Sequence, residues 1–354
     1  WADYAFISSM VVQRTSAQQI IKRCKELGVK VVAGGPLFTS EHEQFENVDH
    51  FVLNEAELTL PPFLEDLHNN CARRVYSTSH FADIQKTPAP LWELADLKQY
   101  ASMSIQYTRG CPYHCEFCNV TSLFGRNPRT KTPEQIVAEL DSFYSMGWRG
   151  SVFFVDDNLI GNKKSLKNEL LPALIKWQRE HVPIPFNTEV SINVADDESL
   201  MHMMSEAGFN TVFVGIETPD TEGLAECNKK QNKNRDLVED VRRIQRAGLQ
   251  VQAGFIVGFD TDTKSIFQRQ IDFIQKSGIV SAMVGMLQAP RGTRLYERLK
   301  QEGRLLGQMS GDNLDGTTNI IPKMDIDTFR EGYKKILRHI YSPENYYQRI
   351  KTFF

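Results

Sequence analysis

The chain has 354 residues, of which 41 are basic and 44 acidic, so its formal net charge is -3. This balance gives no electrostatic reason to expect nucleic acid or an anionic membrane as a partner. No apolar run approaches the roughly 18 residues that a membrane-spanning helix needs. The sequence therefore predicts a soluble cytoplasmic protein without a transmembrane segment, and its length favours one large domain with a smaller one.

The amino-terminal segment alternates strands and helices, as in a parallel α/β sheet. The predicted elements are strands over 3–7, 29–33 and 51–53 and helices over 16–27 and 57–68. Ser16 is a plausible N-cap of the first helix, and Gly28 should end it. Residues 1–10 read as a buried strand without an initiator Met, so we expect the chain to begin inside a domain.

The second half of the chain repeats an apolar segment followed by a helical one. A proline-containing stretch with few periodic apolar positions, 73–101, reads as an irregular linker before it. The apolar segments lie at 103–107, 152–155, 186–190, 211–216, 251–257 and 282–287. Repeated βα units predict a parallel barrel or a doubly wound sheet, with functional residues in the loops after the strands.

The boundaries of several intervening helices are marked by their sequence. Thr132 precedes a proline at the start of one helix, and Gly208 and Gly248 follow two others. The last stretch, 325–354, is amphipathic, and its apolar residues at Phe329, Tyr333, Ile336 and Ile340 share one helical face. We interpret that face as a packing surface.

Three cysteines follow the first strand of the repeated units. Cys111, Cys115 and Cys118 are separated by three and then two residues. Three thiolates at this spacing can surround a 4Fe-4S cubane and leave one iron without a protein ligand. A structural zinc site would need a fourth Cys or His at a second knuckle, and His114 lies awkwardly between two of the ligands. An electron-transfer cluster would normally take four cysteines.

At these residues the sequence resembles the radical S-adenosylmethionine superfamily, whose signature is Cys-x3-Cys-x2-Cys after the first strand of a partial (β/α)6 barrel. The resemblance implies that S-adenosylmethionine chelates the open iron and is cleaved reductively to a 5′-deoxyadenosyl radical, so that the cofactor supplies the difficult chemistry. It also implies that the backbone of Phe117 contacts adenine. Simple packing is the alternative for this aromatic residue.

Polar residues after the following strands are further candidates for cofactor binding. They are Asp156, Asp157, Asn158, Glu189, Ser191 and Glu217. Two adjacent carboxylates are costly to desolvate without a cationic or hydrogen-bonding partner. The cofactor ammonium would supply a cation, although the sequence departs from the family's Gly-Gly-Glu-like motif here. Glu189, Ser191 and Glu217 correspond to positions that meet the ribose and methionine portions of the cofactor in the family. The alternatives are a solvated rim or buried groups that are satisfied within the protein.

Small residues end the first two strands, with Ser8 and Ser9 after one and Gly34 and Gly35 after the next. They resemble the second half of a cobalamin-binding domain, where such residues make room for the nucleotide tail. Loops that turn toward any other ligand also use them. The segment Glu55-x-Glu57 resembles the end of that domain, and we expect the first cobalamin-binding loop to precede Trp1.

Longer stretches resemble the branch of cobalamin-dependent radical enzymes that includes the hopanoid C-2 methylases. They begin at Gln106, Val155, Gly215 and Ala282. The implied organisation is part of a doubly wound cobalamin-binding domain over 1–72, a linker over 73–101, a partial (β/α)6 barrel over 102–300 and a helical segment over 301–354. Members of the branch continue past the position of Phe354, so we expect the carboxyl end to be trimmed.

The resemblance implies an enzyme that abstracts hydrogen from an unactivated carbon and transfers a methyl group to that carbon from methylcobalamin. It implies a small-molecule substrate, with lipid-like molecules among the candidates, and an electron donor such as flavodoxin or ferredoxin. Two alternatives remain open. One is a cobalamin-associated radical rearrangement or cyclisation without methyl transfer, and the other is a non-catalytic Fe-S redox or binding protein.

Overall fold

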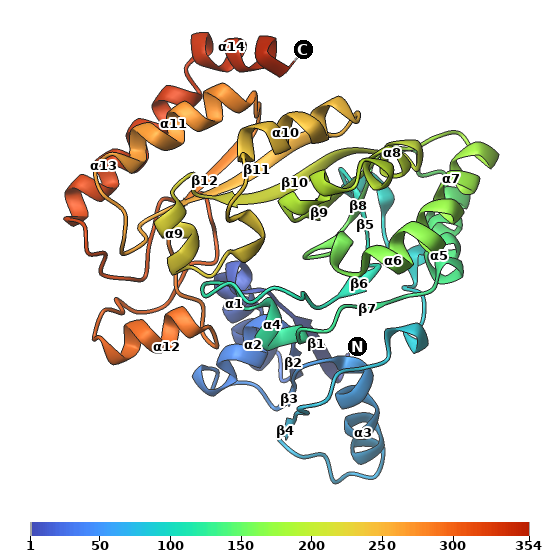
Figure 1. The fold of residues 1–354 in the computed structure, drawn as a ribbon. Coiled ribbons are helices and arrows are strands. Elements are labelled where there is room, and N and C mark those ends of the chain that lie inside the picture. The colour runs from blue at the N-terminus through green and yellow to red at the C-terminus, as the bar shows by residue number, and fades with distance from the viewer. Residues whose placement is uncertain (1, 354) are drawn as a thin grey trace.

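A computed structural model describes residues 2–353, and Figure 1 shows a smaller amino-terminal α/β unit below a larger one that carries the carboxyl-terminal helices. The smaller unit contains a sheet of order β1-β2-β3-β4, and the larger contains a sheet of order β12-β11-β10-β9-β8-β5. Trp1 and Phe354, the outermost residues of the two expected terminal segments, lie outside the described residues. In the described part of the chain no helix is both long and apolar enough to cross a bilayer.

The amino-terminal sheet is parallel throughout, as predicted. Its strands are β1 (Tyr4–Ser8), β2 (Lys30–Gly34), β3 (His50–Val52) and β4 (Val75–Tyr76), and its helices are α1 (Arg14–Glu26), α2 (Pro36–Glu41) and α3 (Ala56–His68). The expectation of a buried first strand is wrong for the described residues, because β1 is an edge strand on which Phe6 is 57% exposed. The helix α1 starts earlier than predicted, at a cap formed by Gln13 instead of Ser16. Gly28 ends it with φ +72°.

The stretch expected to be an irregular linker contains a strand. In β4, Val75 and Tyr76 pair in parallel with β3 and complete the first sheet. Tyr76 is buried against Phe63 of α3, with ring centroids 5.4 Å apart. The rest of the stretch has only short 3-10 turns on its way to the larger sheet.

The larger sheet confirms all six predicted strands. They are β5 (Met103–Ile105), β8 (Val152–Phe154), β9 (Phe186–Val190), β10 (Phe209–Glu217), β11 (Gln250–Val257) and β12 (Ala282–Met286). Every neighbouring pair is parallel, and β5 and β12 form the two edges, which gives an open, partial barrel. Alternate residues of β9 and β11 are buried, as expected from the two-residue period of a strand.

Helices cover the outside of this sheet and pack their apolar stripes on it (Figure 1). They are α5 (Pro133–Ser145), α7 (Leu171–Glu180), α8 (Glu198–Glu206), α9 (Thr221–Glu226), α10 (Leu237–Arg246) and α11 (Ile266–Ser277), whereas the three-residue α6 (Lys163–Ser165) buries no side chain. Thr132 caps α5 in a reciprocal arrangement with Gln135. Gly208 and Gly248 follow α8 and α10 with φ of +98° and +91°, which confirms their predicted role as helix ends.

Between β5 and α5 the chain forms a hairpin-like excursion that carries the three cysteines. The short antiparallel strands β6 (Thr108–Arg109) and β7 (Arg129–Thr130) close its base, and α4 (Val120–Phe124) lies between them. The cysteine loop therefore begins directly after β6. Its two ends are held together, so the loop has a fixed base.

The carboxyl-terminal segment begins with α12 (Arg294–Gln301) and ends with α13 (Ile326–Ile340) and α14 (Pro343–Phe353). The predicted apolar face of α13 is confirmed, because Phe329, Tyr333, Ile336 and Ile340 are all buried. The single amphipathic helix expected over 325–354 is divided, since Pro343 starts a new helix. An extended segment, 302–325, connects α12 to α13.

Candidate active site

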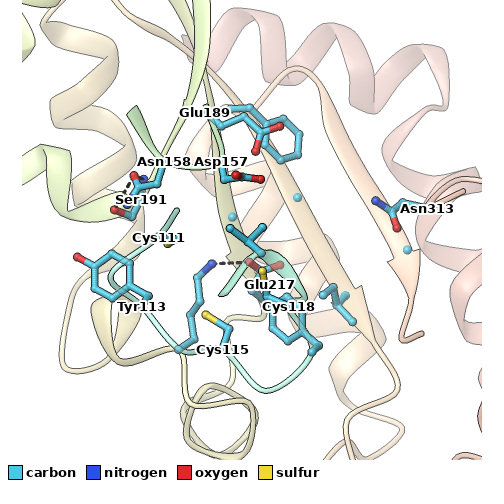
Figure 2. Close-up of a pocket in the computed structure, with 18 of the residues that line it drawn as sticks. Cys111, Tyr113, Cys115, Cys118, Asp157, Asn158, Glu189, Ser191, Glu217 and Asn313 are labelled. Atoms are coloured by element: carbon cyan, nitrogen blue, oxygen red, sulfur yellow. Dashed lines mark hydrogen bonds and ion pairs between the residues drawn. The ribbon is translucent and has the colours of Figure 1, made fainter. Parts of the chain in front are cut away.

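A cavity of about 310 Å³ lies at the carboxyl ends of the strands of the larger sheet (Figure 2). All six strands or the loops after them contribute to its wall, as do residues 309 and 313 of the segment between α12 and α13. Its size lies at the lower end of the range for small-molecule sites. Polar groups concentrate at the side of β5 to β10, and apolar groups at the side of β11 and β12.

The three predicted cluster ligands all line this cavity. The loop turns at Gly110, whose φ is +96° and where a Cβ atom would lie 3.0 Å from the carbonyl oxygens of Phe124 and Gly125. Burial raises the pKa of the Cys111 and Cys115 thiols, and it raises that of Cys118 to about 12. Buried thiols of this kind become thiolates when a metal binds, because the charge of the metal outweighs the loss of solvation.

The arrangement of the thiols fits a cluster better than a single ion. In the described part of the chain, no three or more Cys, His, Asp or Glu side chains are placed to hold one metal ion together. A cubane has a different requirement, because each of three thiolates binds a different iron. Three cysteines on one loop that line the same cavity fit that requirement, and a cluster held by them would keep one iron without a protein ligand.

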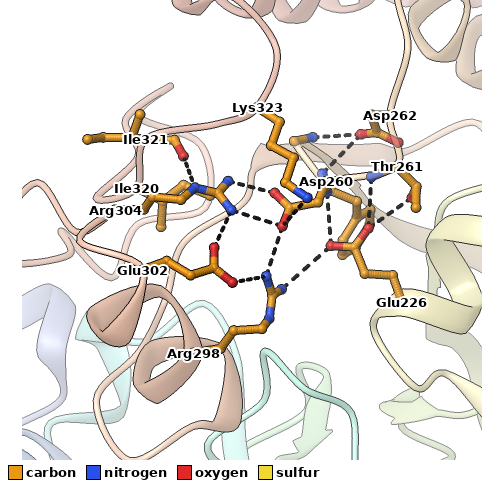
Figure 3. Close-up of polar contacts among 12 residues, drawn as sticks. Glu226, Asp260, Thr261, Asp262, Arg298, Glu302, Arg304, Ile320, Ile321 and Lys323 are labelled. Carbon is orange, nitrogen blue, oxygen red and sulfur yellow. Dashed lines mark hydrogen bonds and ion pairs between the residues drawn. The ribbon is translucent and has the colours of Figure 1, made fainter.

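A network of charged side chains fastens the cysteine loop to α12, and Figure 3 shows the part of this network around Asp260, Arg298 and Arg304. Arg298 donates to both carboxylate oxygens of Glu116, at 2.9 and 3.2 Å, and to Asp260 at 2.8 Å. Asp260 also accepts from Arg304 at 2.6 Å. Although burial opposes it, these guanidinium groups lower the pKa of Asp260 to about 2. The backbone N–H of Leu295 adds a hydrogen bond to the Glu116 carbonyl.

The base of the same loop is fastened to the amino-terminal unit. Glu55, which is 3% exposed, accepts from Arg129 at 2.6 and 2.8 Å and lies 3.7 Å from Arg109. Glu57 pairs with Arg109 at 3.0 Å. The Glu55-x-Glu57 segment noted in the sequence thus connects the amino-terminal unit to β6 and β7, the strands that close the cysteine loop.

Two carboxylates that line the cavity have no ion-pair partner within the described residues. Figure 2 shows Asp157 and Glu189 close together in the upper part of the cavity, with Cys115 and Cys118 below them. Loss of hydration raises the pKa of Asp157 to about 6. It raises that of Glu189 to about 7, with further contributions from the charges of Asp157 and Glu217. The cavity therefore favours a cationic group.

Glu217 differs from these two because its charge is already balanced. Its Oε1 lies 2.6 Å from the Nζ of Lys229, which is buried. Although burial opposes it, Glu217 and the thiols of Cys115 and Cys118 raise the pKa of Lys229. The Glu217 backbone has φ +63°, uncommon for a residue with a side chain. The pair places a fixed positive charge beside two of the three thiols.

Asp156 and Asn158 flank Asp157 and have different surroundings. Asp156 was expected on the rim together with Asp157, but it is fully buried and does not line the cavity. It accepts hydrogen bonds from the backbone N–H groups of Tyr107 and Thr108. Asn158 lines the cavity and accepts from the Ser191 N–H at 3.0 Å and from its hydroxyl at 3.2 Å. Its buried Nδ2 has no hydrogen-bond partner within the described residues. That donor is available to a ligand.

The opposite wall is mostly apolar. Phe117 lines the cavity and its ring lies 6.4 Å from that of Phe259, so packing accounts for part of its role. The other apolar side chains of the cavity are Val120, Val190, Phe213, Phe255, Ile256, Met283, Met286, Leu287, Pro290 and Met309. Gly254 and Gly285 also line this wall, which leaves the strand backbone accessible.

The segment 306–319 closes the cavity on the side of β12. Gln288, after β12, holds it through hydrogen bonds to the carbonyls of Asp312 and Thr317, at 3.1 and 3.5 Å. Met309 and Asn313 of this segment line the cavity. On its other side the segment contacts the amino-terminal unit, where a Cβ atom at Gly311 would lie 2.7 Å from the Val12 nitrogen. Gln308 donates a hydrogen bond to Gln44.

Several cavity residues could not be identified in the sequence. Lys229 lies in a Lys-Lys pair after a short helix, which is typical of a solvated surface. Gln231, whose Nε2 lies 3.9 Å from the Cys115 Sγ, follows in the same loop. Met309 and Asn313 come from a segment without periodicity. The proximity of these four residues to the cysteines or the cavity appears only in the folded chain.

The four small residues of the amino-terminal sheet meet where β1 and β2 end. A Cβ atom at Gly35 would lie 2.7 Å from the Ser8 Oγ and 2.9 Å from the Ser9 nitrogen, and one at Gly34 would lie 2.6 Å from the Val52 oxygen. Packing between neighbouring loops thus accounts for both glycines. Ser8 is exposed, and its hydroxyl has no hydrogen-bond partner within the described residues. Ser8 is the member of this group that is free to contact a ligand.

Comparison with known proteins agrees with the fold and the cysteine loop. Residues 105–274 match the model of the radical SAM superfamily, and residues 293–354 match a domain of unknown function, DUF4070. The chain therefore belongs to the radical SAM superfamily. It is 43% identical over 354 residues to an uncharacterized methyltransferase from Synechocystis sp., covering 99% of this chain and 66% of that protein.

The resemblance to the branch of the hopanoid C-2 methylases is also confirmed. The chain is 37% identical over 349 residues to the hopanoid C-2 methylase of Rhodopseudomonas palustris, covering 97% of this chain and 65% of that enzyme. The chain thus spans about two thirds of the length of these curated relatives. The fold is similar to that of the radical SAM methyltransferase TsrM from Kitasatospora setae, which was solved with cobalamin and a [4Fe-4S] cluster bound. The TM-score is 0.70 and the sequence identity 14%, and the similarity covers 85% of this chain and 64% of that one.

Proposed function

We propose that the protein is a radical S-adenosylmethionine methyltransferase that methylates an unactivated carbon of a small molecule through cobalamin. The observation that carries this proposal is the convergence of Cys111, Cys115 and Cys118 with the unpaired carboxylates of Asp157 and Glu189 at one cavity. A bound cluster would supply the electron that cleaves the cofactor. The unpaired carboxylates would attract the sulfonium cofactor and its ammonium group, since opposite charges at short range favour the ionised forms.

The remaining cavity residues would orient the cofactor and the substrate. The free Nδ2 of Asn158 is placed to donate to a carboxylate or hydroxyl of the cofactor. Ser191 would fix the Asn158 amide in that orientation, and Glu217 would act through its pair with Lys229 near the thiols. The backbone of Phe117 is proposed to contact adenine. We assign Asp156 to the support of the cysteine loop.

The apolar wall supports an apolar substrate. Phe213, Phe255, Met283 and Met286 line the cavity opposite the carboxylates, and a lipid-like molecule would bury its hydrocarbon surface there.

Cobalamin would approach along the side of the amino-terminal sheet, with Ser8, Ser9, Gly34 and Gly35 near its nucleotide tail. A flavodoxin or ferredoxin would supply electrons, and the oxygen-sensitive cluster fits a reducing compartment such as the cytoplasm.

The deciding experiment is anaerobic reconstitution of the native protein that contains this chain, followed by reduction with dithionite. We expect 5′-deoxyadenosine to form and a candidate lipid to exchange one hydrogen for a methyl group, which raises its mass by that of one CH2 unit. Formation of 5′-deoxyadenosine with a product of unchanged carbon count would favour rearrangement or cyclisation. A protein that binds iron and sulfide yet leaves S-adenosylmethionine intact would contradict the proposal and favour a redox carrier.

Cobalamin binding needs a separate test, for which Ser8 offers a better variant than the glycines. A Gly35→Leu change would disturb the fold directly, because its Cβ atom would meet Ser8 and Ser9. Ser8 is exposed, so Ser8→Trp should leave the fold intact and weaken hydroxocobalamin binding in an equilibrium titration. Binding equal to that of the parent protein would remove Ser8 from the cobalamin site.

A further inference from the structure

Basic residues surround the outer side of the cysteine loop. Arg126, just after α4, donates to the carbonyl of Pro112 at 3.4 Å, and Arg294, at the start of α12, donates to the carbonyl of His114 at 2.9 Å. Both arginines are exposed. Segments far apart in the sequence thus bring two guanidinium groups to one short stretch of the loop.

A third arginine extends this basic surface. Arg291 lies in the loop before α12, with its guanidinium carbon 5.8 Å from the centre of the Tyr296 ring. The same loop packs on α4, because a Cβ atom at Gly292 would lie 3.3 Å from the Ser122 Oγ. Arg126, Arg291 and Arg294 therefore occupy adjoining segments around the loop. We call these three residues the basic surface.

The charges of the basic surface are not balanced by the protein. Within residues 2–353, none of the three arginines has a carboxylate oxygen within 4 Å. Arg109, Arg129 and Arg298, which hold the same loop from its other sides, are each engaged in ion pairs. The arginines around the loop thus fall into two groups: those in ion pairs, and the three of the basic surface, of which Arg126 and Arg294 are exposed and Arg291 is half-buried.

The position of the basic surface relates it to the cluster ligands. His114, whose carbonyl Arg294 contacts, directly precedes the cluster ligand Cys115, so the basic surface lies on the outer side of a ligand-bearing stretch of the loop. We propose that Arg126, Arg291 and Arg294 form the docking surface for an acidic, one-electron protein donor of the flavodoxin or ferredoxin class. The inference rests on the proposed function, since only a reductively activated cluster needs such a donor.

Docking would allow the transfer of one electron. The reduced donor would lose this electron and the oxidised cluster would gain it, with no atom transferred. An acidic donor would be attracted to unpaired guanidinium groups, and complementary charge raises association rates and makes them sensitive to salt. Docking over His114 would bring the donor beside the Cys115 thiolate.

The test compares two double variants with equal change of charge. Arg126→Glu with Arg294→Glu reverses the charge at the two exposed residues of the basic surface, and Arg330→Glu with Arg338→Glu reverses it at two exposed arginines of α13 that form no ion pair within the described residues. Titration of each reconstituted protein with fluorescently labelled oxidised flavodoxin gives the dissociation constant at several salt concentrations. We expect binding by the first variant to be at least about tenfold weaker, and binding by the second to equal that of the parent.

A kinetic ratio separates docking from effects on the cluster loop. For each protein, the rate of 5′-deoxyadenosine formation with reduced flavodoxin is divided by the rate with dithionite, which needs no docking surface. The ratio should fall in the Arg126→Glu, Arg294→Glu protein and recover when both positions are Lys. Equal affinities and equal ratios in the two Glu variants, or binding without salt dependence, would overturn the inference. Absence of 5′-deoxyadenosine in the parent even with dithionite would instead contradict the proposed function. The flavodoxin titration would still test whether the basic surface binds the donor.

Discussion

The cysteines around the cavity differ from a fourth one close by. Cys227 is 1% exposed, and its carbonyl accepts a hydrogen bond from the Glu116 N–H at 2.9 Å, so it touches the same loop without lining the cavity. We expect Cys115→Ala to abolish 5′-deoxyadenosine formation and to lower bound iron, because an iron would lose its thiolate. Cys227→Ala should retain both. Retention of the parent rate by Cys115→Ala would refute the ligand assignment.

Asp156 and Asp157 should respond to substitution in opposite ways. Asp157→Asn removes an unpaired charge from the cavity, so it should raise the dissociation constant of S-adenosylmethionine about tenfold with little change in stability. Asp156→Ala leaves two backbone N–H groups without their acceptor and should cost about 1–3 kcal/mol of stability. Equilibrium binding and chemical denaturation measure the two effects. Weaker binding in both variants with equal stability would contradict this division.

The raised pKa values of the cavity carboxylates predict a pH dependence. Asp157 and Glu189 lose their protons near pH 6 and 7, and only the ionised forms attract a cation. Affinity for S-adenosylmethionine should therefore rise as the pH increases from about 5.5 to 8. Glu189→Gln should flatten the upper part of this curve. A binding constant independent of pH in the parent, measured with the cluster intact, would exclude this role for both residues.

At the scale of residues, the sequence identified the cysteines because their spacing is local. It could not separate Asp156 from Asp157, although exposure alternates from Phe154 to Asp157, as in an extended chain that continues past β8. The pairing of Glu217 with Lys229 could not be predicted, because it depends on how α9 returns the chain to the cavity. Such contacts are set by tertiary structure and have no periodic signal.

At the scale of elements, α12 acts as the support of the cysteine loop. Arg298→Met would leave Glu116 and Asp260 without their shared cation, and we expect a loss of about 1–3 kcal/mol in stability together with faster loss of iron. Lys300→Met is the control, because Lys300 is exposed on the same helix and forms no ion pair within the described residues. Thermal unfolding and timed iron release compare the two. Equal iron release would show that the loop holds its cluster without α12.

The long elements were predictable, and the short or context-dependent features were not. Six strands and several helix ends were recognised from apolar runs, from the Thr132 cap and from glycines at helix ends. The two-residue β4 and the one-and-a-half-turn α2 are too short to give a pattern. The exposure of β1 could not be predicted, because an apolar segment has the same sequence whether its strand is central or at an edge.

At the scale of the whole molecule, the buried Glu55 joins the amino-terminal unit to the base of the cysteine loop. Glu55→Ala would leave Arg129 unpaired at the base of the cysteine loop and should lower the free energy of unfolding by about 3 kcal/mol. Glu57→Ala is the matched control, since Glu57 is 22% exposed and has one ion pair, with Arg109. Denaturant unfolding, with protease cleavage of 73–101 as a second readout, tests the difference. Equal losses of unfolding free energy in the two variants would mean that the deeper burial of Glu55 does not make its ion pair more stabilising than that of Glu57.

The segment 306–319 contacts both the cavity and the amino-terminal unit, and these two contacts limit the changes in length that the segment can accept. One side of it supplies Met309 and Asn313 to the cavity, and the other rests on Val12 and Gln44 of the amino-terminal unit. An insertion that enlarged the cavity would therefore push against the first sheet. We expect relatives that accept different molecules to vary the side chains at these two positions while keeping the length of the segment. Exchange of those two side chains is accordingly the change most suited to altering substrate choice by design.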